Sequence, residues 1–596
     1  MMDYPVRLGN DRRKREIATA SEGCPAMIYC KNVIKHDPSH GKIMTEPRID
    51  YSLGEYQDAF NSALQKVRQD NIVERIRAKD YTLWKPRPDE IVNRLGWLNA
   101  PAATLEKANY IRAVLEPLLG KNIQDVVMMG IGGSSLAAEV FKKIIGGKTG
   151  FPRLHIVDTT DPFFISEIAQ SINPGNTLFI VSSKSGTTLE ISSLFKYFYN
   201  LAFKNSGRSA GSRFVFITDE GSPLVKTAEE IAAHITFFSN SDIGGRYSAL
   251  SLTGIVPAAV IGIDVETLLQ KVSSNLEALM SASSSLGATL GTLANRGRDK
   301  LTILLPQHWQ SFGDWLEQLI AESTGKEGKG ILPVLDEPLR AQDAYGKDRV
   351  FIVFQNEENR TSFPMESLIS AGHPVIIVKI NDDYDLGVQM YIWEMATAVA
   401  AHFLGVNPFD QPNVEATKKH TRAVIANLYK STNEKPALTF EQCEIFGKIT
   451  GATSIEALND FLKQAKSGDY ICLQNYLSRS PEIDEAVNLL REAVLKKFSL
   501  PVTFGYGPRY LHSTGQLHKG DSGNGLFIQL TQNFSTDIDI PDKICEEKSS
   551  LSFGALKAAQ AQGDFQALTE AERKIIRFHF PQNPVAGLKI FTEILQ

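Results

Sequence analysis

Cysteine is scarce in this sequence, and its spacing excludes both a disulfide framework and a standard metal site. Only 5 of the 596 residues are cysteine, an odd number with no Cys-x-x-Cys pair. Such scattered thiols are typical of a reducing, cytoplasmic compartment. One cluster of metal-binding residue types lies near the N-terminus, at Cys24, Cys30, His36 and His40. Its spacing matches no common zinc site, so we expect no metal.

Long apolar runs and an excess of positive charge are also missing. No apolar run approaches the ~20 residues that cross a membrane. The N-terminus is basic but lacks the apolar segment of a secretory signal. The formal net charge is -5, opposite in sign to that of a general nucleic-acid binder. We therefore expect a cytoplasmic protein that binds neither nucleic acid nor a membrane.

What is present is an ordinary globular composition, with 43% hydrophobic and 22% charged residues. Strand-like apolar runs alternate with amphipathic helix patterns, which predicts parallel sheets covered by helices on both faces. We therefore predict an α/β protein. Its expected parts are an N-terminal helical arm over 1–100, two doubly wound parallel-sheet domains over 101–270 and 271–435, and a C-terminal α/β region over 436–596.

Two loops of small polar residues follow strand-like runs in the first of these domains, and each loop opens an amphipathic helix. They lie at residues 130–134 and 182–188, and the second holds five hydroxyls and one ammonium. Free N–H groups and the helix dipole favour an anion at such a position, and this density of hydroxyls suits a phosphate monoester. Neither loop has the glycine order of a Walker A or a Rossmann fingerprint. For either loop alone, a simple strand-to-helix turn is an equal alternative; two at one sheet edge favour phosphosugar binding.

These loops resemble the sugar-isomerase (SIS) family and, within it, the glucose-6-phosphate isomerases. The family pattern G-I-G-G-S occurs at 130–134, and S-K-T-x-T-T-x-E occurs at 183–190. In the second, Ser185 replaces a threonine and keeps the hydroxyl, while Gly186 replaces an apolar or aromatic residue. The resemblance implies that both doubly wound domains are of the sugar-isomerase type.

Three further motifs carry the same resemblance. They are G-G-R-[FY]-S at 244–248, E-S-x-G-K at 322–326, and N-x-F-D-Q-x-G-V-E-x-x-K at 407–418. The last departs from the family at Pro412, where an aromatic residue is usual, and at Asn413, where glycine is usual. As a set, the motifs are far more specific than any one of them.

The resemblance implies reversible isomerisation of glucose 6-phosphate and fructose 6-phosphate through a cis-enediol, without cofactor or metal, by a homodimer. It assigns Glu322 as the base, Arg246 as the charge that stabilises the enediolate, and Lys418 as a partner of a histidine in ring opening. The remaining residues expected around the phosphate are Gly132, Gly133, Ser134, Ser183, Lys184, Ser185, Thr187, Thr188, Glu190, Gly245 and Gln411.

The ring-opening histidine is where this sequence departs most from ordinary isomerases, which carry it shortly after the base. The corresponding stretch LDEPLRAQDAYGKDR has no histidine. Residues 436–596 resemble instead the isomerase half of fused transaldolase–isomerase enzymes, and GPRYLHSTGQLHKGD within them echoes the missing segment. We predict His512 as the acid/base at the ring oxygen, with His518 as second choice. The alternative is two exposed histidines in a structural loop.

A second function class is open to a protein with these loops, namely a phosphosugar-sensing regulatory binding protein. A sensor needs the hydroxyl-rich loops but not the catalytic side chains. Because Glu322, Arg246 and Lys418 are all present, the sequence favours the enzyme.

Overall fold

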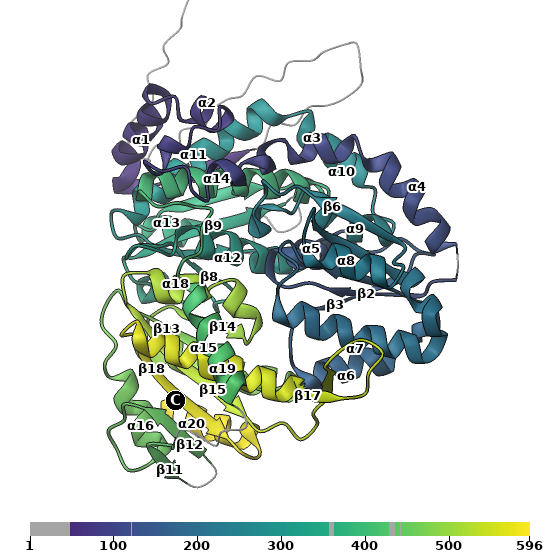
Figure 1. Ribbon diagram of the computed structural model, residues 1–596. Coiled ribbons are helices and arrows are strands. Elements are labelled where there is room, and N and C mark those ends of the chain that lie inside the picture. The colour runs from purple at the N-terminus through teal and green to yellow at the C-terminus, as the bar shows by residue number, and fades with distance from the viewer. Residues whose placement is uncertain (1–47, 121, 357–362, 428–434, 441–442) are drawn as a thin grey trace, which may run out of the picture. The chain divides into compact units, whose positions relative to one another are not determined.

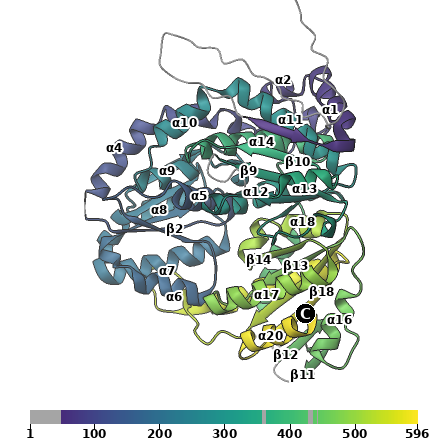
Figure 2. The ribbon, with the colours of Figure 1, turned by 180° about the vertical axis from the view of Figure 1, so that it is seen from behind.

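The computed structural model describes residues 48–120, 122–356, 363–427, 435–440 and 443–596 (Figures 1 and 2). They form three sheets of five, five and six strands and one two-stranded hairpin. Within these ranges, no helix is long and apolar enough to cross a membrane. The predicted α/β class is confirmed.

The first sheet is wholly parallel, in the order β3-β2-β4-β5-β6. Its strands are β2 (Asp125–Met129), β3 (Arg153–Val157), β4 (Thr177–Ser182), β5 (Phe214–Asp219) and β6 (Ile235–Ser239). Alternate residues of β2 enter different cores: Val126 and Met128 face one, Val127 and Met129 the other. Both faces therefore need helices, which explains the continuous apolar run. The helices are α3 (Ala100–Leu105), α4 (Ala108–Leu119), α5 (Leu136–Ile144), α6 (Pro162–Ser171), α7 (Leu189–Ser206), α8 (Pro223–Glu230) and α9 (Leu252–Val260).

The second sheet has the order β1-β10-β9-β7-β8, and only its edge strand β1 is antiparallel to its neighbour. Its strands are β1 (Ile49–Ser52), β7 (Lys300–Leu304), β8 (Leu332–Val334), β9 (Arg349–Gln355) and β10 (Val375–Lys379). The helices of this part are α1 (Gln57–Gln69), α2 (Ile72–Arg77), α10 (Val265–Ser273), α11 (Leu276–Ala294), α12 (Gln310–Thr324), α13 (Met365–Ser370) and α14 (Asp385–Leu404).

Residues 48–100 differ from the helical arm predicted over 1–100, of which residues 1–47 lie outside the described ranges. Strand β1 pairs with β10, more than 300 residues away in the chain. The polar amphipathic pattern from Ser52 to Asp80 predicts a single helix, but the structure has two, α1 and α2, separated at Asn71, whose φ is 49°. Left-handed backbone of this kind ends a helix, and asparagine tolerates it better than most residues.

The third sheet has the order β11-β12-β18-β15-β13-β14, with parallel pairing from β18 to β14. Its strands are β11 (Leu438–Phe440), β12 (Cys443–Gly447), β13 (Tyr470–Asn475), β14 (Val502–Tyr506), β15 (Gly525–Gln532) and β18 (Lys574–Phe580). The helices are α15 (Val414–Asn427), α16 (Ser454–Leu462), α17 (Pro481–Phe498), α18 (Gly515–Gly520), α19 (Phe553–Glu570) and α20 (Pro584–Leu595). Apolar runs at 470–477, 500–507, 525–531 and 574–580 predict four strands, and the structure confirms them as β13, β14, β15 and β18.

The hairpin of β16 (Asp539–Pro541) and β17 (Ser549–Ser552) lies in the chain between β15 and α19 and contacts α7. Asn200 of α7 donates to the carbonyl of Glu546 at 2.8 Å and accepts from the N–H of Cys545 at 2.7 Å. In Figure 1 the hairpin strand β17 lies beside α6 and α7. The third part therefore contacts the helices of the first sheet directly.

Short 3₁₀ turns occupy many of the connections. Three of them belong to the candidate site: η5 (Gly132–Ser134), η8 (Gly245–Tyr247) and η11 (Arg509–His512). The others are η1 (Gly54–Tyr56), η2 (Tyr81–Leu83), η3 (Val92–Arg94), η4 (Gly96–Asn99), η6 (Pro174–Asn176), η7 (Gly207–Arg213), η9 (Gln307–Trp309) and η10 (Gln342–Ala344).

Candidate active site

The two hydroxyl-rich loops lie side by side, as predicted, because they follow the adjacent parallel strands β2 and β4. Within the second loop, the Ser183 hydroxyl accepts the N–H of Gly186 at 3.2 Å and lies 3.3 Å from the Thr188 hydroxyl. Thr188 is the N-cap of α7, yet its side chain makes no cap hydrogen bond. The N–H groups of the first turn of α7 are therefore not capped by that side chain, which is the arrangement that favours a bound anion.

Lys184 occupies this loop but its ammonium is turned to a protein partner. Its Nζ lies 2.6 Å from the Asp219 carboxylate at the end of β5 and 2.8 Å from the carbonyl of Ser241. In this arrangement the lysine ties the loop to its neighbours. A direct contact of Lys184 with phosphate stays a prediction.

Turns η5 and η8 touch through two glycines. A Cβ atom added to Gly133 would lie 2.0 Å from the carbonyl oxygen of Gly245 and 2.7 Å from the amide nitrogen of Arg246. Gly132 has a φ of +57°, a left-handed conformation that glycine adopts without strain. The G-G-S and G-G-R patterns are thus needed for the backbone contact that brings Arg246 to the first loop.

Glu322, in the last turn of α12, lies against Arg246. Its Oε1 is 3.0 Å from Nη1 of Arg246, and its Oε2 accepts from Nε2 of Gln318 at 3.2 Å. The arginine is 4% exposed and also donates to the hydroxyl of Ser323 at 2.9 Å. These contacts fix the carboxylate in one position, with 13% of its side chain open to solvent.

The segment before α15 contacts the guanidinium of Arg246 as well. Arg246 donates to the carbonyls of Pro408 at 2.7 Å and Asp410 at 2.9 Å, and to the side-chain oxygen of Gln411 at 3.0 Å. Lys326 holds the same segment, since its ammonium lies 2.8 Å from the Asp410 carboxylate. Burial, and then the nearby charge of Arg246, lower the pKa of Lys326 to about 8. The motifs at 244–248, 322–326 and 407–418 therefore meet in one place.

His512 joins this group from η11. Its Nε2 lies 3.2 Å from Oε1 of Glu190, the first acidic residue of α7. Gln318 donates to the carbonyl of His512 at 2.7 Å through the same nitrogen that contacts Glu322. The pKa of Glu190 lies below its ordinary value, because burial, which raises it, is outweighed by the hydrogen bond and charge of His512 and the charge of Lys418.

The loop that carries His512 packs directly on the loop that follows Glu322. A Cβ atom at Gly325 would lie 2.4 Å from the Cα of Leu517. Gln516 donates to the Gly325 carbonyl at 3.0 Å and to the Asn413 side chain at 2.7 Å. Asn413, which replaces the usual glycine of its motif, therefore contacts the loop that carries His512.

His518, six residues beyond His512, lies apart from the other candidates. Its side chain is 1% exposed and lies 3.6 Å from the Cys472 thiol and 3.4 Å from the amide of Gln474, with its ring against Phe527. Burial lowers the pKa of His518 well below its ordinary value. The structure thus places it in the core beneath the site.

Lys418 lies on the exposed side of α15. Its ammonium pairs with Glu415 at 2.7 Å, and 44% of its side chain is exposed. It is close enough to Glu190 to affect its ionisation. A direct role in ring opening stays a prediction.

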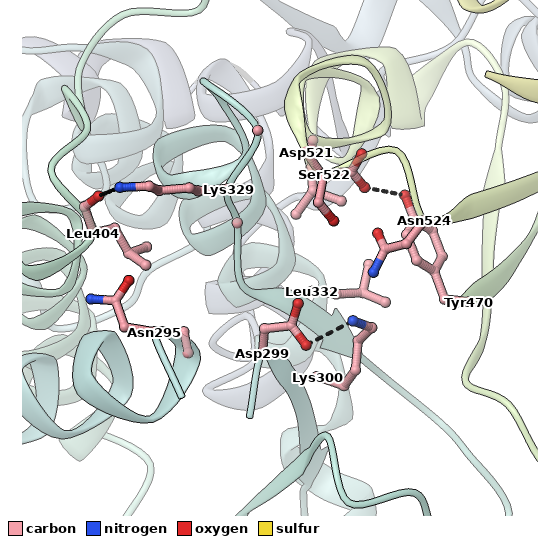
Figure 3. A pocket seen from close by; sticks show the side chains of 14 residues that line it. Asn295, Asp299, Lys300, Lys329, Leu332, Leu404, Tyr470, Asp521, Ser522 and Asn524 are labelled. Atoms are coloured by element: carbon pink, nitrogen blue, oxygen red, sulfur yellow. Dashed lines mark hydrogen bonds and ion pairs between the residues drawn. The ribbon is translucent and has the colours of Figure 1, made fainter. Parts of the chain in front are cut away.

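A small cavity of about 130 Å³ lies away from these residues (Figure 3). Two pairs of side chains in its lining contact each other: Asp299 with Lys300 at 2.7 Å, and Tyr470 with Asp521 at 2.8 Å. None of the candidate residues lines it. A larger cavity of about 1230 Å³ borders the site at Gly132 and continues past the ends of β3 and β14.

In the part of the chain that the structure describes, no three His, Cys, Asp or Glu side chains are grouped to hold a metal ion. The cluster of Cys24, Cys30, His36 and His40 lies outside the described residues.

Part of this chain matches one family model, and curated proteins and solved structures resemble more of it. Residues 111–327 match the family model described as phosphoglucose isomerase. Glucose-6-phosphate isomerases of Clostridium tetani and Rubrobacter xylanophilus are 27% and 28% identical to this chain; the alignments cover 56% and 59% of it and 86% and 93% of theirs.

Among solved structures, a hypothetical protein of Thermus thermophilus aligns with a TM-score of 0.54 and 24% identity, covering 64% of this chain and 100% of its own. A glucose-6-phosphate isomerase of Chlamydia trachomatis aligns with a TM-score of 0.53 and 19% identity, covering 65% and 90%. The family match includes both hydroxyl-rich loops, Arg246 and Glu322, and ends before the segments that carry Gln411 and His512.

Proposed function

Since the chain is related to the phosphoglucose isomerases, we propose that it interconverts glucose 6-phosphate and fructose 6-phosphate. The observation that carries the proposal is the pair of Glu322 and Arg246, 3.0 Å apart, beside a phosphate-type loop and a histidine–carboxylate pair. A regulatory sensor would need the phosphate-type loop, but it would need neither Glu322 nor the histidine–carboxylate pair.

Glu322 is the proposed base of the isomerisation step. It removes the proton from C2 of the open-chain aldose, which leaves a cis-enediolate with its negative charge on O1. The proton of the C2 hydroxyl moves to O1, and Glu322 returns its proton to C1, which gives the ketose. Negative charge develops on the oxygens of the enediol, and Arg246 is the fixed cation that stabilises it. Because several side-chain and backbone contacts already hold this guanidinium, little reorganisation is needed during the reaction.

His512 is the proposed acid/base of ring opening. As the C1–O5 bond breaks, His512 gives a proton to the ring oxygen O5 and takes up the proton that the C1 hydroxyl releases, while Glu190 orients the imidazole. Lys418 assists from α15 in this proposal. The burial of His518 supports His512 alone as the ring-opening histidine.

The phosphate is proposed to lie at the start of α7. The hydroxyls of Ser183, Ser185, Thr187 and Thr188, together with the N–H groups of the first turn, are the donors that a phosphate monoester accepts. Ser134 and Gln411 lie in the segments that border this position. We also propose a homodimer in the cytoplasm, with no nucleic-acid partner, on the family resemblance and the net charge of -5.

The test is turnover of fructose 6-phosphate, followed by coupled detection of glucose 6-phosphate. Glu322→Gln should lower turnover at least about 100-fold, because the amide cannot remove a proton, while a phosphorylated aldonic acid still binds. Glu327→Gln is the matched control, since this glutamate is 53% exposed and pairs with Lys85. Binding without turnover by the parent protein would support the sensor, and a Glu322→Gln variant with more than about a tenth of parental turnover would remove Glu322 from its role.

A further inference from the structure

Helix α19 presents a stripe of buried polar side chains to the candidate site. Lys557, Gln560 and Asp564 are spaced three and four residues apart, so they share one face of the helix. Their exposures are 1%, 3% and 0%. Polar groups this deeply buried destabilise a protein unless they are hydrogen-bonded, so the partners of each are informative.

Each member of the stripe contacts a different segment. Lys557 pairs with Asp161, which caps α6. Asp564 binds the ammonium of Lys519 at 2.6 Å and the hydroxyl of Tyr510 at 2.7 Å. Tyr510 and Lys519 flank His512 in the sequence, so this contact holds the loop of the histidine.

Gln560, which lies between Lys557 and Asp564 on α19, contacts Glu190. Its Nε2 donates to Oε1 of Glu190 at 2.8 Å, and its Oε1 accepts the hydroxyl of Thr160 at 2.7 Å. An ionised carboxylate only accepts hydrogen bonds, so the nitrogen of the amide must face Glu190. Thr160 satisfies the remaining oxygen and thereby fixes the amide in this orientation.

The same oxygen of Glu190 therefore receives two donors, His512 at 3.2 Å and Gln560 at 2.8 Å. We propose that Gln560 is a positioning residue for ring opening: it holds Glu190 ionised and aimed at His512. The inference rests on the proposed function and extends it to a residue in the C-terminal part, outside the family match at 111–327.

Other charged and titratable groups face Glu190 from the surrounding elements. His512 faces it from η11, Lys418 from α15, and the Tyr476 hydroxyl from the end of β13. None of these is changed by a substitution at Gln560. A shift in the pH dependence of a Gln560 variant would therefore report the loss of the amide donor.

Gln560→Leu removes that donor and leaves an apolar side chain of similar size. Hydrogen bonds to charged groups are strong enough that we expect kcat/KM for cyclic glucose 6-phosphate to fall about 10- to 100-fold near neutral pH. The acidic limb of the pH profile should move to higher pH, because Glu190 is then more easily protonated. Proton exchange at C1 of an acyclic tetrose phosphate, which needs no ring opening, should stay within about threefold of the parent.

Gln560→Glu is a second variant of nearly the same shape. A second carboxyl beside Glu190 opposes its ionisation, so the same limb should move in the same direction. Gln566→Leu is the matched control, because Gln566 lies on the same helix and is only partly buried. It should leave the rates on both substrates unchanged.

The outcomes separate this inference from the proposed function. If the parent turns over neither substrate, the proposed function fails and this inference fails with it. Suppose that the parent is active but that Gln560→Leu and Gln560→Glu lower the rates on the cyclic and the acyclic substrate by the same factor, or leave the acidic limb of the pH profile unchanged. Gln560 then has only a structural role, and the inference is wrong. A selective loss on the cyclic substrate with a shifted acidic limb supports it.

Discussion

Two histidines six residues apart, His512 in η11 and His518 in α18, have different surroundings. The ring of His512 faces the carboxylate of Glu190, whereas the ring of His518 faces the Cys472 thiol and an amide, and burial lowers the pKa of His518. An imidazole oriented by a carboxylate at the site is placed to transfer a proton to and from a substrate. One buried without a charged partner stays neutral and acts as a core side chain.

This difference predicts opposite results for the two substitutions. His512→Ala should lower turnover of cyclic glucose 6-phosphate about 100-fold or more, with a smaller effect on an acyclic tetrose phosphate. His518→Gln should leave kcat within about threefold of the parent, because the residue does not reach the site. The pair of variants is compared in one coupled assay with both substrates. A larger loss for His518→Gln than for His512→Ala would reverse our assignment.

His518 also predicts a pH dependence of stability. Its folded-state pKa is depressed, whereas in the unfolded chain the pKa is about 6.5, so the unfolded chain binds an extra proton as the pH falls below about 6.5. Stability is then lost by up to about 1.4 kcal/mol per pH unit from this group. The fall in the thermal midpoint from about pH 7 to about pH 5 should be smaller in His518→Gln than in the parent. His373 and His402, whose pKa values burial also lowers, are present in both proteins and cancel in the comparison. Equal falls would contradict this account.

At the scale of elements, the site depends on the contact between η5 and η8. Gly133→Ala would place a methyl group 2.0 Å from the carbonyl oxygen of Gly245, so the two turns must separate. We expect Arg246 to shift and kcat/KM to fall at least about 10-fold, since a misplacement of about 1 Å in a catalytic group is enough for such a loss. Gly147→Ala is the control, because its added Cβ meets only ordinary contacts with Ile261 at 3.6 Å and beyond. Equal activity of the two variants would show that the close contact is not needed.

The sequence predicted the elements that depend on local patterns. Each hydroxyl-rich loop follows one strand and opens one helix, so its position at a sheet edge could be inferred from neighbouring residues alone. Many of the buried strands, such as β2, β9 and β15, were likewise visible as apolar runs, but β8 and β12 were not predicted. The pairing of β1 with β10 was not, because an edge strand of four residues has no pattern that specifies so distant a partner.

Side-chain partners were the part that sequence could not supply. Lys184 was predicted from its motif as a phosphate contact, but its partner Asp219 comes from the end of another strand. Gln560 lies in an ordinary helix pattern, and its contact with Glu190 spans 370 residues of chain. The first pair depends on the order of strands within one sheet and the second on the packing of the C-terminal part against the first sheet, and no local motif encodes either.

At the scale of the whole molecule, Arg509 joins the part that carries His512 to the other two. It contacts Glu139 of α5, lies 3.2 Å from Asp158 after β3, and lies 3.6 Å from Asp314 of α12. Burial raises the pKa of Asp158 to about 6, and for Glu139 the charges of Arg509 and Lys143 outweigh burial and hold the pKa at about 2. The arginine is thus the main counter-charge for a group of carboxylates contributed by separate elements.

Arg509→Met should therefore destabilise the protein, and more strongly at high pH. Removing one partner of a buried ion pair typically costs about 3–5 kcal/mol, because the carboxylates stay buried without their counter-charge. Their folded-state pKa values then rise above the unfolded values, so the folded state binds more protons and stability falls as the pH rises through that window. The deficit in thermal midpoint against the parent should be larger at about pH 8 than at about pH 5. Arg479→Met is the matched control: its side chain is 61% exposed, and its pair with Asp484 should contribute at most about 1 kcal/mol at either pH. A deficit for Arg509→Met that is no larger than that of Arg479→Met, or that grows toward the acidic pH, would show that Arg509 does not neutralise these carboxylates.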